Sequence, residues 1–173
     1  MTPDWHLRLA RPEDAGYLPE IERAAARLFK GEPGLEGLDL DHTWQPEDLR
    51  RLIRKGHCLV AYIGEQLVGF IVTQPFQREL HVWELSVVPA AQRMGIGAGL
   101  VHACLADARN AGFSAVTLTT FRDVAWNGPF YARLGFVELA DPGSHTRLAE
   151  MLTSEAESGL PADRRCAMIC PTS

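Results

Sequence analysis

The chain has 173 residues, 46% of them hydrophobic and 23% charged, with a formal net charge of −5. This composition is typical of a globular protein, and we expect a single domain over residues 1–173. The negative net charge argues against a nucleic-acid partner, because binding to a phosphate backbone depends on basic clusters. The sequence has neither a secretory signal nor an apolar run of membrane-spanning length, so we expect a cytoplasmic protein without a membrane partner.

The first third of the chain predicts a strand and two helices. Apolar residues alternate over residues 5–9, as in a half-buried strand. A helix is expected over residues 12–30, with Pro19 as the point where it kinks or divides, and a shorter helix over residues 46–56. The segment between them, residues 31–44, is irregular and acidic, which makes it our candidate for contacting an acceptor. Its ionisable residues include Glu32, Glu36, Asp39, Asp41 and His42.

The middle and end of the chain predict the rest of a sheet. Residues 57–63 and 66–74 are apolar, β-branched runs around a Gly-Glu turn and predict a hairpin. Residues 80–88 are apolar on both faces and are therefore expected at the centre of the sheet. The next helix carries an apolar stripe at Leu100, Cys104 and Ala108 and ends at Gly112. A strand over residues 114–121, a short helix, another strand and a closing helix–strand pair that ends at residues 165–170 follow.

The cysteines do not predict a metal site. They lack the paired spacing of zinc ligands, and Cys166 and Cys170 would lie roughly 13 Å apart on one strand, too far for a disulfide. No His or acid neighbours them in an arrangement typical of a nucleophile. We therefore interpret all four as reduced, buried thiols, at Cys58, Cys104, Cys166 and Cys170.

Residues 85–100, Leu-Ser-Val-Val-Pro-Ala-Ala-Gln-Arg-Met-Gly-Ile-Gly-Ala-Gly-Leu, carry the most informative pattern. A β-like run ends at Pro89 and gives way to a glycine-rich turn that opens a helix. Glycines at alternate positions let successive backbone N–H groups converge on an anion at the positive end of a helix dipole, and Arg93 adds a full charge. The pattern predicts a phosphate-binding turn.

Two common phosphate-binding turns do not fit. A nucleotide P-loop needs Lys and then Ser or Thr after its last glycine, where this chain has Leu100 and Val101. A dinucleotide fingerprint needs a third glycine at position 100 and an acidic residue at the end of the next strand, which ends instead in Thr119 and Thr120. The remaining pattern is Gln-x-x-Gly-x-Gly preceded by Val-x-Pro.

This pattern resembles the acetyl-CoA signature of the GNAT acetyltransferase superfamily, and a second motif supports the resemblance. Residues 125–136, Ala-Trp-Asn-Gly-Pro-Phe-Tyr-Ala-Arg-Leu-Gly-Phe, are similar to the family's other hallmark: Asn, then Phe-Tyr, then Gly-Phe. The residue types in this motif also fit a short helix, because Asn127 can cap it and Phe130 and Leu134 can form its buried stripe. Gly135 permits the left-handed turn that ends that helix.

The resemblance spans nearly the whole chain and implies an α/β fold with a mixed, mostly antiparallel sheet of about seven strands flanked by helices. It implies acetyl-CoA as cosubstrate and no metal, with the pyrophosphate on the amides of residues 93–98 and the pantetheine beside residues 86–88. The implied cofactor-binding residues are Ser86, Val87, Val88, Gln92, Arg93, Met94, Gly95, Ile96, Gly97, Ala98, Asn127 and Tyr131.

The resemblance also implies a mechanism in which the amine attacks the thioester directly and Tyr131 protonates the departing thiolate. A primary amine with a pKa of about 10.4 needs a base, for which Glu84 is the first candidate, because a carboxylate is costly in so apolar a strand. His81 is the second, although a satisfied histidine between strand and helix is an equal alternative. Strand alternation places His81 and Glu79 on one face and Glu84 on the other, and Glu79 is expected to be solvated.

The leading hypothesis is an acetyl-CoA-dependent N-acetyltransferase acting on a small, cationic amine. Two alternatives stay open: an enzyme that acetylates a protein or peptide, and a non-catalytic module that senses acyl-CoA, against which Tyr131 argues. The resemblance further implies a homodimer, with the final strand as a partner edge.

Overall fold

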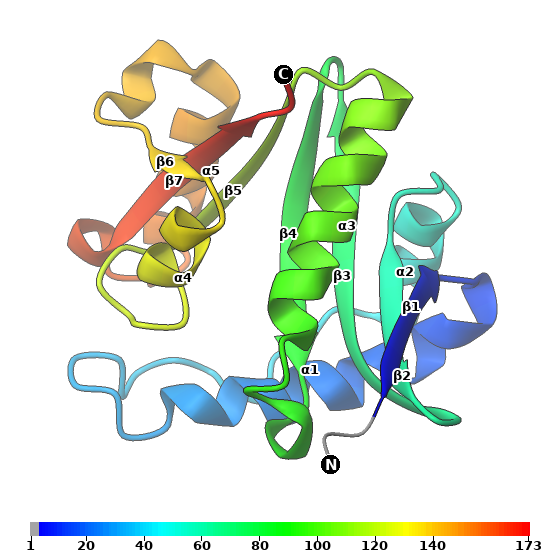
Figure 1. The fold of residues 1–173 in the computed structure, drawn as a ribbon. Coiled ribbons are helices and arrows are strands. Elements are labelled where there is room, and N and C mark those ends of the chain that lie inside the picture. The colour runs from blue at the N-terminus through cyan, green and yellow to red at the C-terminus, as the bar shows by residue number, and fades with distance from the viewer. Residues whose placement is uncertain (1–3) are drawn as a thin grey trace. The chain divides into compact units, whose positions relative to one another are not determined.

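The structure, a computed structural model, describes residues 4–173 and has the α/β architecture expected from the sequence (Figure 1). A seven-stranded mixed sheet has the strand order β1-β2-β3-β4-β5-β7-β6 and is flanked by helices. The predicted fold class is confirmed. The strands are β1 (Trp5–Leu9), β2 (Leu59–Ile63), β3 (Gln66–Phe76), β4 (Glu79–Val87), β5 (Ala115–Phe121), β6 (Val137–Glu138) and β7 (Arg165–Pro171).

The helices are short to medium in length. None that lies within residues 4–173 is long and apolar enough to cross a bilayer. The α-helices are α1 (Leu18–Ala26), α2 (Pro46–Ile53), α3 (Ile96–Ala111), α4 (Gly128–Arg133) and α5 (Thr146–Glu157). The 3₁₀ turns are η1 (Pro12–Gly16), η2 (Arg27–Phe29), η3 (Pro89–Ala91), η4 (Pro142–Ser144) and η5 (Ala162–Arg164).

The chain divides into two compact units. Within the described residues, the first unit contains residues 4–75 and 82–107, and the second contains residues 76–81 and 108–173. Strand β4 therefore begins in the second unit and continues in the first. The single-domain extent over residues 1–173 stays a prediction.

The first unit has its core where helices α1 and α2 pack on strands β2 and β3. The inward stripes of both helices meet alternate side chains of the two strands, as the helical and strand periodicities require. The buried cluster consists of Ala15, Leu18, Ile21, Leu49, Leu52, Ile53, Cys58, Val60, Phe70 and Val72.

The segment over residues 12–30 is divided, as predicted, but the division does not lie at Pro19. The segment consists of η1, α1 and η2, with the break between the first two at Tyr17. Pro19 lies in the first turn of α1, because proline has no N–H to donate and its fixed φ suits a helix start. The second helix also ends earlier than predicted, at Ile53.

Helix α3 and strand β1 meet at a glycine. A Cβ added to Gly99 would lie 2.5 Å from the ring of Trp5, so the absence of a side chain lets the indole lie against the helix. The predicted inward stripe of α3 is confirmed, because Leu100, Cys104 and Ala108 are all buried.

Strand β5 is the central strand of the second unit. Its first three residues pair in parallel with residues 79–81, and its full length pairs antiparallel with β7. Strand β6 pairs with the other edge of β7, and helix α5 packs against β5 and β7. The predicted strand at the end of the chain is confirmed, but its expected role as a partner edge is wrong, because β6 pairs with its outer side at Met168 and Ile169 and is itself the edge of the sheet. All four cysteines are buried and free, as expected.

Candidate active site

The turn between β4 and α3 has the backbone of an anion-binding loop. Arg93 and Gly95 have φ angles of 64° and 85°, in the left-handed region. Such residues turn successive N–H groups toward one side of the chain. Glycine adopts this conformation freely, whereas Arg93 carries a backbone strain of about 1–2 kcal/mol. Strain of this kind is concentrated at functional turns.

Two side chains hold the turn at its ends. Gln92 Nε2 donates to the Val87 carbonyl at 3.0 Å. Trp5 Nε1 donates to the Met94 carbonyl, also at 3.0 Å. The loop is therefore fixed by the protein itself, which reduces the entropy lost when a ligand binds.

Helix α3 leaves its first amides available for a ligand. The Gly99 amide donates to the Gly95 carbonyl at 2.9 Å, as an i to i−4 helical bond. The first-turn amides of an α-helix have no intrahelical acceptor and carry the positive end of the dipole. In α3 these amides belong to Ile96, Gly97 and Ala98.

The end of β4 contains Ser86 and Glu84 in mutual contact. Ser86 is buried, and its Oγ donates to Glu84 Oε1 at 2.8 Å. Glu84 is half-buried, as are Val87 and Val88 on the path toward the turn. This hydrogen bond holds Oε1 of the Glu84 carboxylate in place.

Asn127 lies at the N-cap of α4 but does not cap the helix. Its side-chain Oδ1 accepts a hydrogen bond from Thr120 Oγ1 at 2.7 Å instead. The predicted cap is wrong, because the side-chain oxygen makes no bond to an amide of the helix and is directed to the hydroxyl on β5. Phe130 and Leu134 are half-buried and not the buried stripe expected, whereas Gly135, at a φ of 102°, confirms the left-handed turn.

Tyr131 is half-buried between two phenylalanines. Its ring meets Phe130 edge-on at a centroid distance of 5.1 Å and Phe136 at 5.6 Å. These contacts fix the ring plane while part of the side chain stays accessible. A tyrosine held in this way can present its hydroxyl in one direction.

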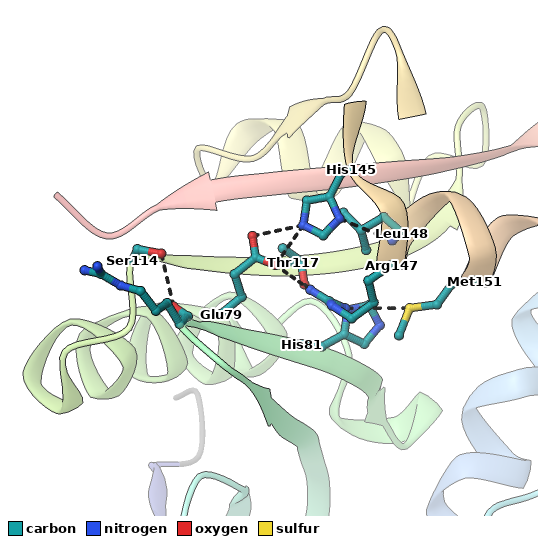
Figure 2. A network of polar contacts seen from close by, with 9 residues as sticks. Glu79, His81, Ser114, Thr117, His145, Arg147, Leu148 and Met151 are labelled. Carbon is teal, nitrogen blue, oxygen red and sulfur yellow. Dashed lines mark hydrogen bonds and ion pairs between the residues drawn. The ribbon is translucent and has the colours of Figure 1, made fainter. Parts of the chain in front are cut away.

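His81 is 1% exposed and lies in a polar network of the second unit (Figure 2). Its Nδ1 is 2.9 Å from Thr117 Oγ1 and 3.2 Å from Arg147 Nη1. Because a guanidinium can only donate, Nδ1 is the acceptor and the neutral ring carries its proton on Nε2. Desolvation, aided by the charge of Arg147, lowers the pKa of His81 to about 3, so the ring is neutral at pH 7.

Glu79 is not solvated, contrary to the prediction. Figure 2 shows its carboxylate between Arg147 Nη2 and His145 Nε2, each at 2.7 Å from Oε1. Burial favours a higher pKa for Glu79, but the hydrogen bonds from Arg147 and His145 outweigh it and lower the pKa from its usual 4.5. His145 Nδ1 accepts the Leu148 amide at the start of α5, which leaves the ring proton on Nε2 for Glu79.

A hollow of about 420 Å³ opens beside this network. The Arg147 guanidinium stacks over the Phe76 ring at 4.5 Å and is bonded on its other sides. The positive charge of Arg147 is therefore compensated by groups of the protein itself. The network also connects α5 to β5 and to the start of β4. The residues that line the hollow are Phe76, Gln77, Glu79, His145, Thr146 and Arg147.

Glu22 on α1 is a carboxylate that the sequence analysis did not single out. Its Oε2 accepts the Trp44 amide at 2.9 Å, and burial raises its pKa above the usual 4.5. The Trp44 ring lies 5.8 Å from the ring of Trp83, tilted by 58°. One signal was available: Glu22 follows the buried Leu18 by four residues, which places a charge on the inward face of the helix.

The predicted site residues are distributed over both units. The turn residues 92–98, the strand end 86–88 and Glu84 belong to the first unit. His81, Asn127 and Tyr131 belong to the second. Within residues 4–173, no group of three His, Cys, Asp or Glu side chains is placed to bind a metal ion.

Comparison with known proteins identifies the family. The model of the acetyltransferase (GNAT) family matches residues 20–136. A GNAT-family acetyltransferase from Brucella melitensis, solved in complex with acetyl-CoA, is 27% identical over 78% of this chain and 83% of that one, with a TM-score of 0.58. The PaiA N-acetyltransferase of Thermoplasma acidophilum, in complex with coenzyme A, is 18% identical over 97% of this chain and 99% of that one, with a TM-score of 0.74.

A third similar structure is a ribosomal-protein-alanine N-acetyltransferase of Escherichia coli, which is 16% identical over 98% of this chain and 95% of that one, with a TM-score of 0.67. Because the family match covers most of the chain and includes the glycine-rich turn, the chain belongs to the acetyltransferase (GNAT) family and is an N-acetyltransferase.

Proposed function

We propose that this enzyme transfers the acetyl group of acetyl-CoA to a primary amine of a small, cationic molecule by direct attack of the amine on the thioester. The backbone of the turn before α3 carries the proposal, because left-handed Arg93 and Gly95 precede a row of first-turn amides. The Brucella and Thermoplasma relatives, in complex with acetyl-CoA and coenzyme A, support this cosubstrate.

The chain's own groups suit the parts of that cosubstrate. The amides of residues 93–98 would hold the diphosphate, and the Arg93 side chain, which is exposed, would add a positive charge. The strand edge at residues 86–88 and the side-chain amide of Asn127 would bind the pantetheine. Bound acetyl-CoA supplies an activated acyl group. The protein has to orient that group, accept a proton from the amine and donate a proton to the departing thiolate.

Glu84 is our first candidate for removing the proton of the amine. A primary ammonium with a pKa of about 10.4 resists deprotonation at pH 7 by roughly 4–5 kcal/mol, which a nearby carboxylate and desolvation must offset. Glu84 is half-buried and fixed by Ser86, so its acceptor oxygens are held in place. It would act directly or through a water molecule.

His81 is the second candidate, and its surroundings make it the weaker base. Its Nδ1 lone pair already accepts from Thr117 and Arg147, and its Nε2 carries the proton. With a pKa of about 3, the ring has little affinity for a proton taken from an amine. In this setting His81 is better suited to donate a hydrogen bond than to accept a proton.

Tyr131 is proposed to protonate the thiolate of coenzyme A as it leaves. A thiol with a pKa near 8.5 is a tolerable leaving group at neutral pH, so this help is worth the low end of the usual 10²–10⁴-fold range. The aromatic contacts with Phe130 and Phe136 would keep its hydroxyl in one place.

A protein or peptide acceptor is the second candidate function. The Escherichia coli neighbour, by its name, acetylates an alanine of a ribosomal protein. At 16% identity this likeness concerns the fold, so the acceptor has to be identified by experiment.

Release of thiol from acetyl-CoA tests both functions in one assay. Mono-, di- and polyamines, amino sugars, and peptides with free N-termini are supplied in turn, and products are identified by mass. We expect the highest kcat/KM with small cationic amines; faster acetylation of peptides would overturn that choice. A Glu84→Gln variant should lower kcat and shift its pH dependence, and an unchanged profile would exclude Glu84. No heat of binding with coenzyme A in calorimetry would overturn the proposal as a whole.

A further inference from the structure

We infer that Thr120 is a positioning residue for the cosubstrate. Its hydroxyl holds the side-chain amide of Asn127 in the one orientation that leaves both N–H groups of that amide for the pantetheine of coenzyme A. This inference rests on the proposed function and deepens it, because it names the residue on which the proposed contact between Asn127 and pantetheine depends.

The first observation is a buried hydroxyl with a single partner. Thr120 lies on the same face of β5 as Val116 and Leu118, and all three side chains are buried. A hydroxyl in such an apolar row is costly unless it makes a hydrogen bond. Its Oγ1 lies 2.7 Å from Asn127 Oδ1, and because an amide oxygen cannot donate, the hydroxyl is the donor. This is the one hydrogen bond that the Thr120 side chain makes within residues 4–173.

The second observation is that only one hydrogen-bonding group of Asn127 is left for a ligand. Its main-chain N–H donates to the Val124 carbonyl at 2.9 Å, and its main-chain carbonyl accepts the Tyr131 amide at 3.0 Å. The side-chain oxygen accepts from Thr120. In the part of the chain that the structure describes, Nδ2 has no acceptor and keeps contact with solvent. Its two N–H groups can therefore bind carbonyl oxygens from outside the chain, and the pantetheine arm contains two amide carbonyls.

The opposite orientation of the Asn127 amide is disfavoured by Thr120. The oxygen and nitrogen of an asparagine amide occupy nearly the same space, so a rotation by about 180° would exchange them. The Thr120 hydroxyl could then accept from Nδ2, but its own proton would be buried without an acceptor among the described residues. Leaving a buried donor unpaired is costly. Thr120 therefore selects the orientation in which Asn127 donates to the ligand.

Main-chain packing, and not the hydroxyl, sets the distance between these two residues. Gly128, the first residue of α4, is buried, and a Cβ added to it would lie 2.6 Å from the Arg122 carbonyl oxygen. The absence of a side chain thus lets the start of α4 approach the end of β5 closely. Removing the Thr120 hydroxyl should accordingly release the orientation of the Asn127 amide without moving Asn127 itself.

Two ligands that differ in the pantetheine arm test the inference by calorimetry. They are coenzyme A and ADP, which has the adenosine and the diphosphate but no pantetheine. Thr120→Val keeps the shape of the side chain and removes the hydroxyl. We expect the Kd for coenzyme A to rise about 3- to 10-fold in this variant and the Kd for ADP to stay at the wild-type value. Thr120→Ser keeps the hydroxyl and should bind both ligands as the wild type does.

Steady-state kinetics give a second readout of the same variant. In thiol release, Thr120→Val should raise KM for acetyl-CoA by a similar factor and leave kcat nearly unchanged, because it weakens binding and touches no reacting atom. A general loss of folded structure would instead lower the amount of active enzyme and affect both ligands alike.

A double variant shows whether Thr120 acts through Asn127. Asn127→Ala removes the whole amide and should weaken coenzyme A binding at least as much as Thr120→Val does. Adding Thr120→Val to Asn127→Ala should then raise the Kd no further. Thr119→Val is the matched control, because it removes the hydroxyl of the neighbouring residue, which donates to Glu155 at 2.8 Å on the other face of β5. Its Kd for coenzyme A should equal that of the wild type.

The possible failures are distinguishable. If Thr120→Val leaves the ratio of the two Kd values unchanged, or weakens coenzyme A binding equally with and without Asn127→Ala, Thr120 does not position Asn127, while the cosubstrate stands. If Asn127→Ala binds coenzyme A as the wild type does, both the contact between Asn127 and pantetheine and this inference are wrong. Absence of any heat with coenzyme A in the wild type overturns the proposed function and this inference with it.

Discussion

His81 makes the stability of the protein depend on pH. The unfolded chain binds a proton at this histidine near its usual pKa of 6.5, whereas the folded chain does so only near 3. Between these values the unfolded state holds more protons, so the free energy of unfolding falls as the pH is lowered from 6.5 toward 3. The slope from this one group approaches about 1.4 kcal/mol per pH unit.

Replacing His81 should remove this slope. We expect His81→Asn to have a flatter dependence of unfolding free energy on pH across that window, measured by urea denaturation. His102→Asn, at an exposed position of α3, is the matched control and should keep the wild-type dependence. Parallel curves for the wild type and His81→Asn would contradict the neutral, buried imidazole.

Glu79 contributes stability in a lower pH window. Its pKa is below 4.5 because Arg147 and His145 hold the ionised form, so its contribution is present above 4.5 and is lost as the pH falls through the lowered pKa. Glu79→Gln should destabilise the protein by about 1–2 kcal/mol at pH 7, a discounted value for a partly exposed pair. The difference from the wild type should disappear in acid, whereas Glu65→Gln, in the exposed β2–β3 turn, should change little at either pH.

Tyr131 can be tested by removing one oxygen. Tyr131→Phe keeps the ring and its contacts with Phe130 and Phe136 but cannot donate a proton to a thiolate. We expect kcat to fall by about 10- to 100-fold with little change in KM for acetyl-CoA, as measured by thiol release. An unchanged kcat would mean that water protonates the leaving group.

Helix α3 depends on the small size of Gly99. In Gly99→Ala the new methyl group would lie 2.5 Å from the Trp5 ring, so the indole must move and its bond to Met94 is lost. We expect a loss of about 1–3 kcal/mol of stability and weaker binding of coenzyme A. A Trp5→Leu background should reduce the stability cost. Gly16→Ala, where nothing lies within 4 Å of the new Cβ, should be nearly neutral.

Elements with strong local patterns could be predicted from the sequence. The β2–β3 hairpin, β4, β5 and the stripe of α3 all have apolar periodicities that local physics fixes. The division of the helix over residues 12–30 was expected at Pro19 and lies at Tyr17, because the pattern does not show where the chain tightens into 3₁₀ turns. Asn127 was predicted to cap α4, but Thr120, from another element, competes for the same oxygen.

The polar contacts around β4 could not be predicted from local sequence patterns, because their partners lie far away in the chain. Glu79 was expected to be solvated because its partners, His145 and Arg147, lie 66 and 68 residues further on. The base candidates could be placed on strand faces, but the pKa shifts of Glu79 and His81 could not be predicted, because they depend on burial and on His145 and Arg147 at the start of α5. The glycine-rich turn could be predicted, since its chemistry is contained in consecutive residues. Localisation, the homodimer and the extent of the domain stay predictions.

Ligand binding should stabilise the entire fold. A ligand that binds only the native state adds RT ln(1 + [L]/Kd), about 2.7 kcal/mol at a hundredfold excess over Kd. For a chain of this size we expect coenzyme A at that excess to raise Tm by roughly 5–10 °C in differential scanning fluorimetry. Arg93→Ala should reduce the shift, and Arg133→Ala, at an exposed position of α4, should not. Equal shifts in both variants would exclude Arg93 from binding.

The indole of Trp5 gives the enzyme an optical reporter. Its N–H donates to the carbonyl of Met94, inside the loop proposed to receive the diphosphate. The diphosphate of coenzyme A would change the electric field across the excited indole. The wavelength and intensity of the Trp5 fluorescence should therefore change when the protein is titrated with coenzyme A. The spectrum of Trp5→Phe identifies the part of the fluorescence that comes from Trp5. Stopped-flow fluorescence can then measure the rate at which the cosubstrate binds, without an attached dye.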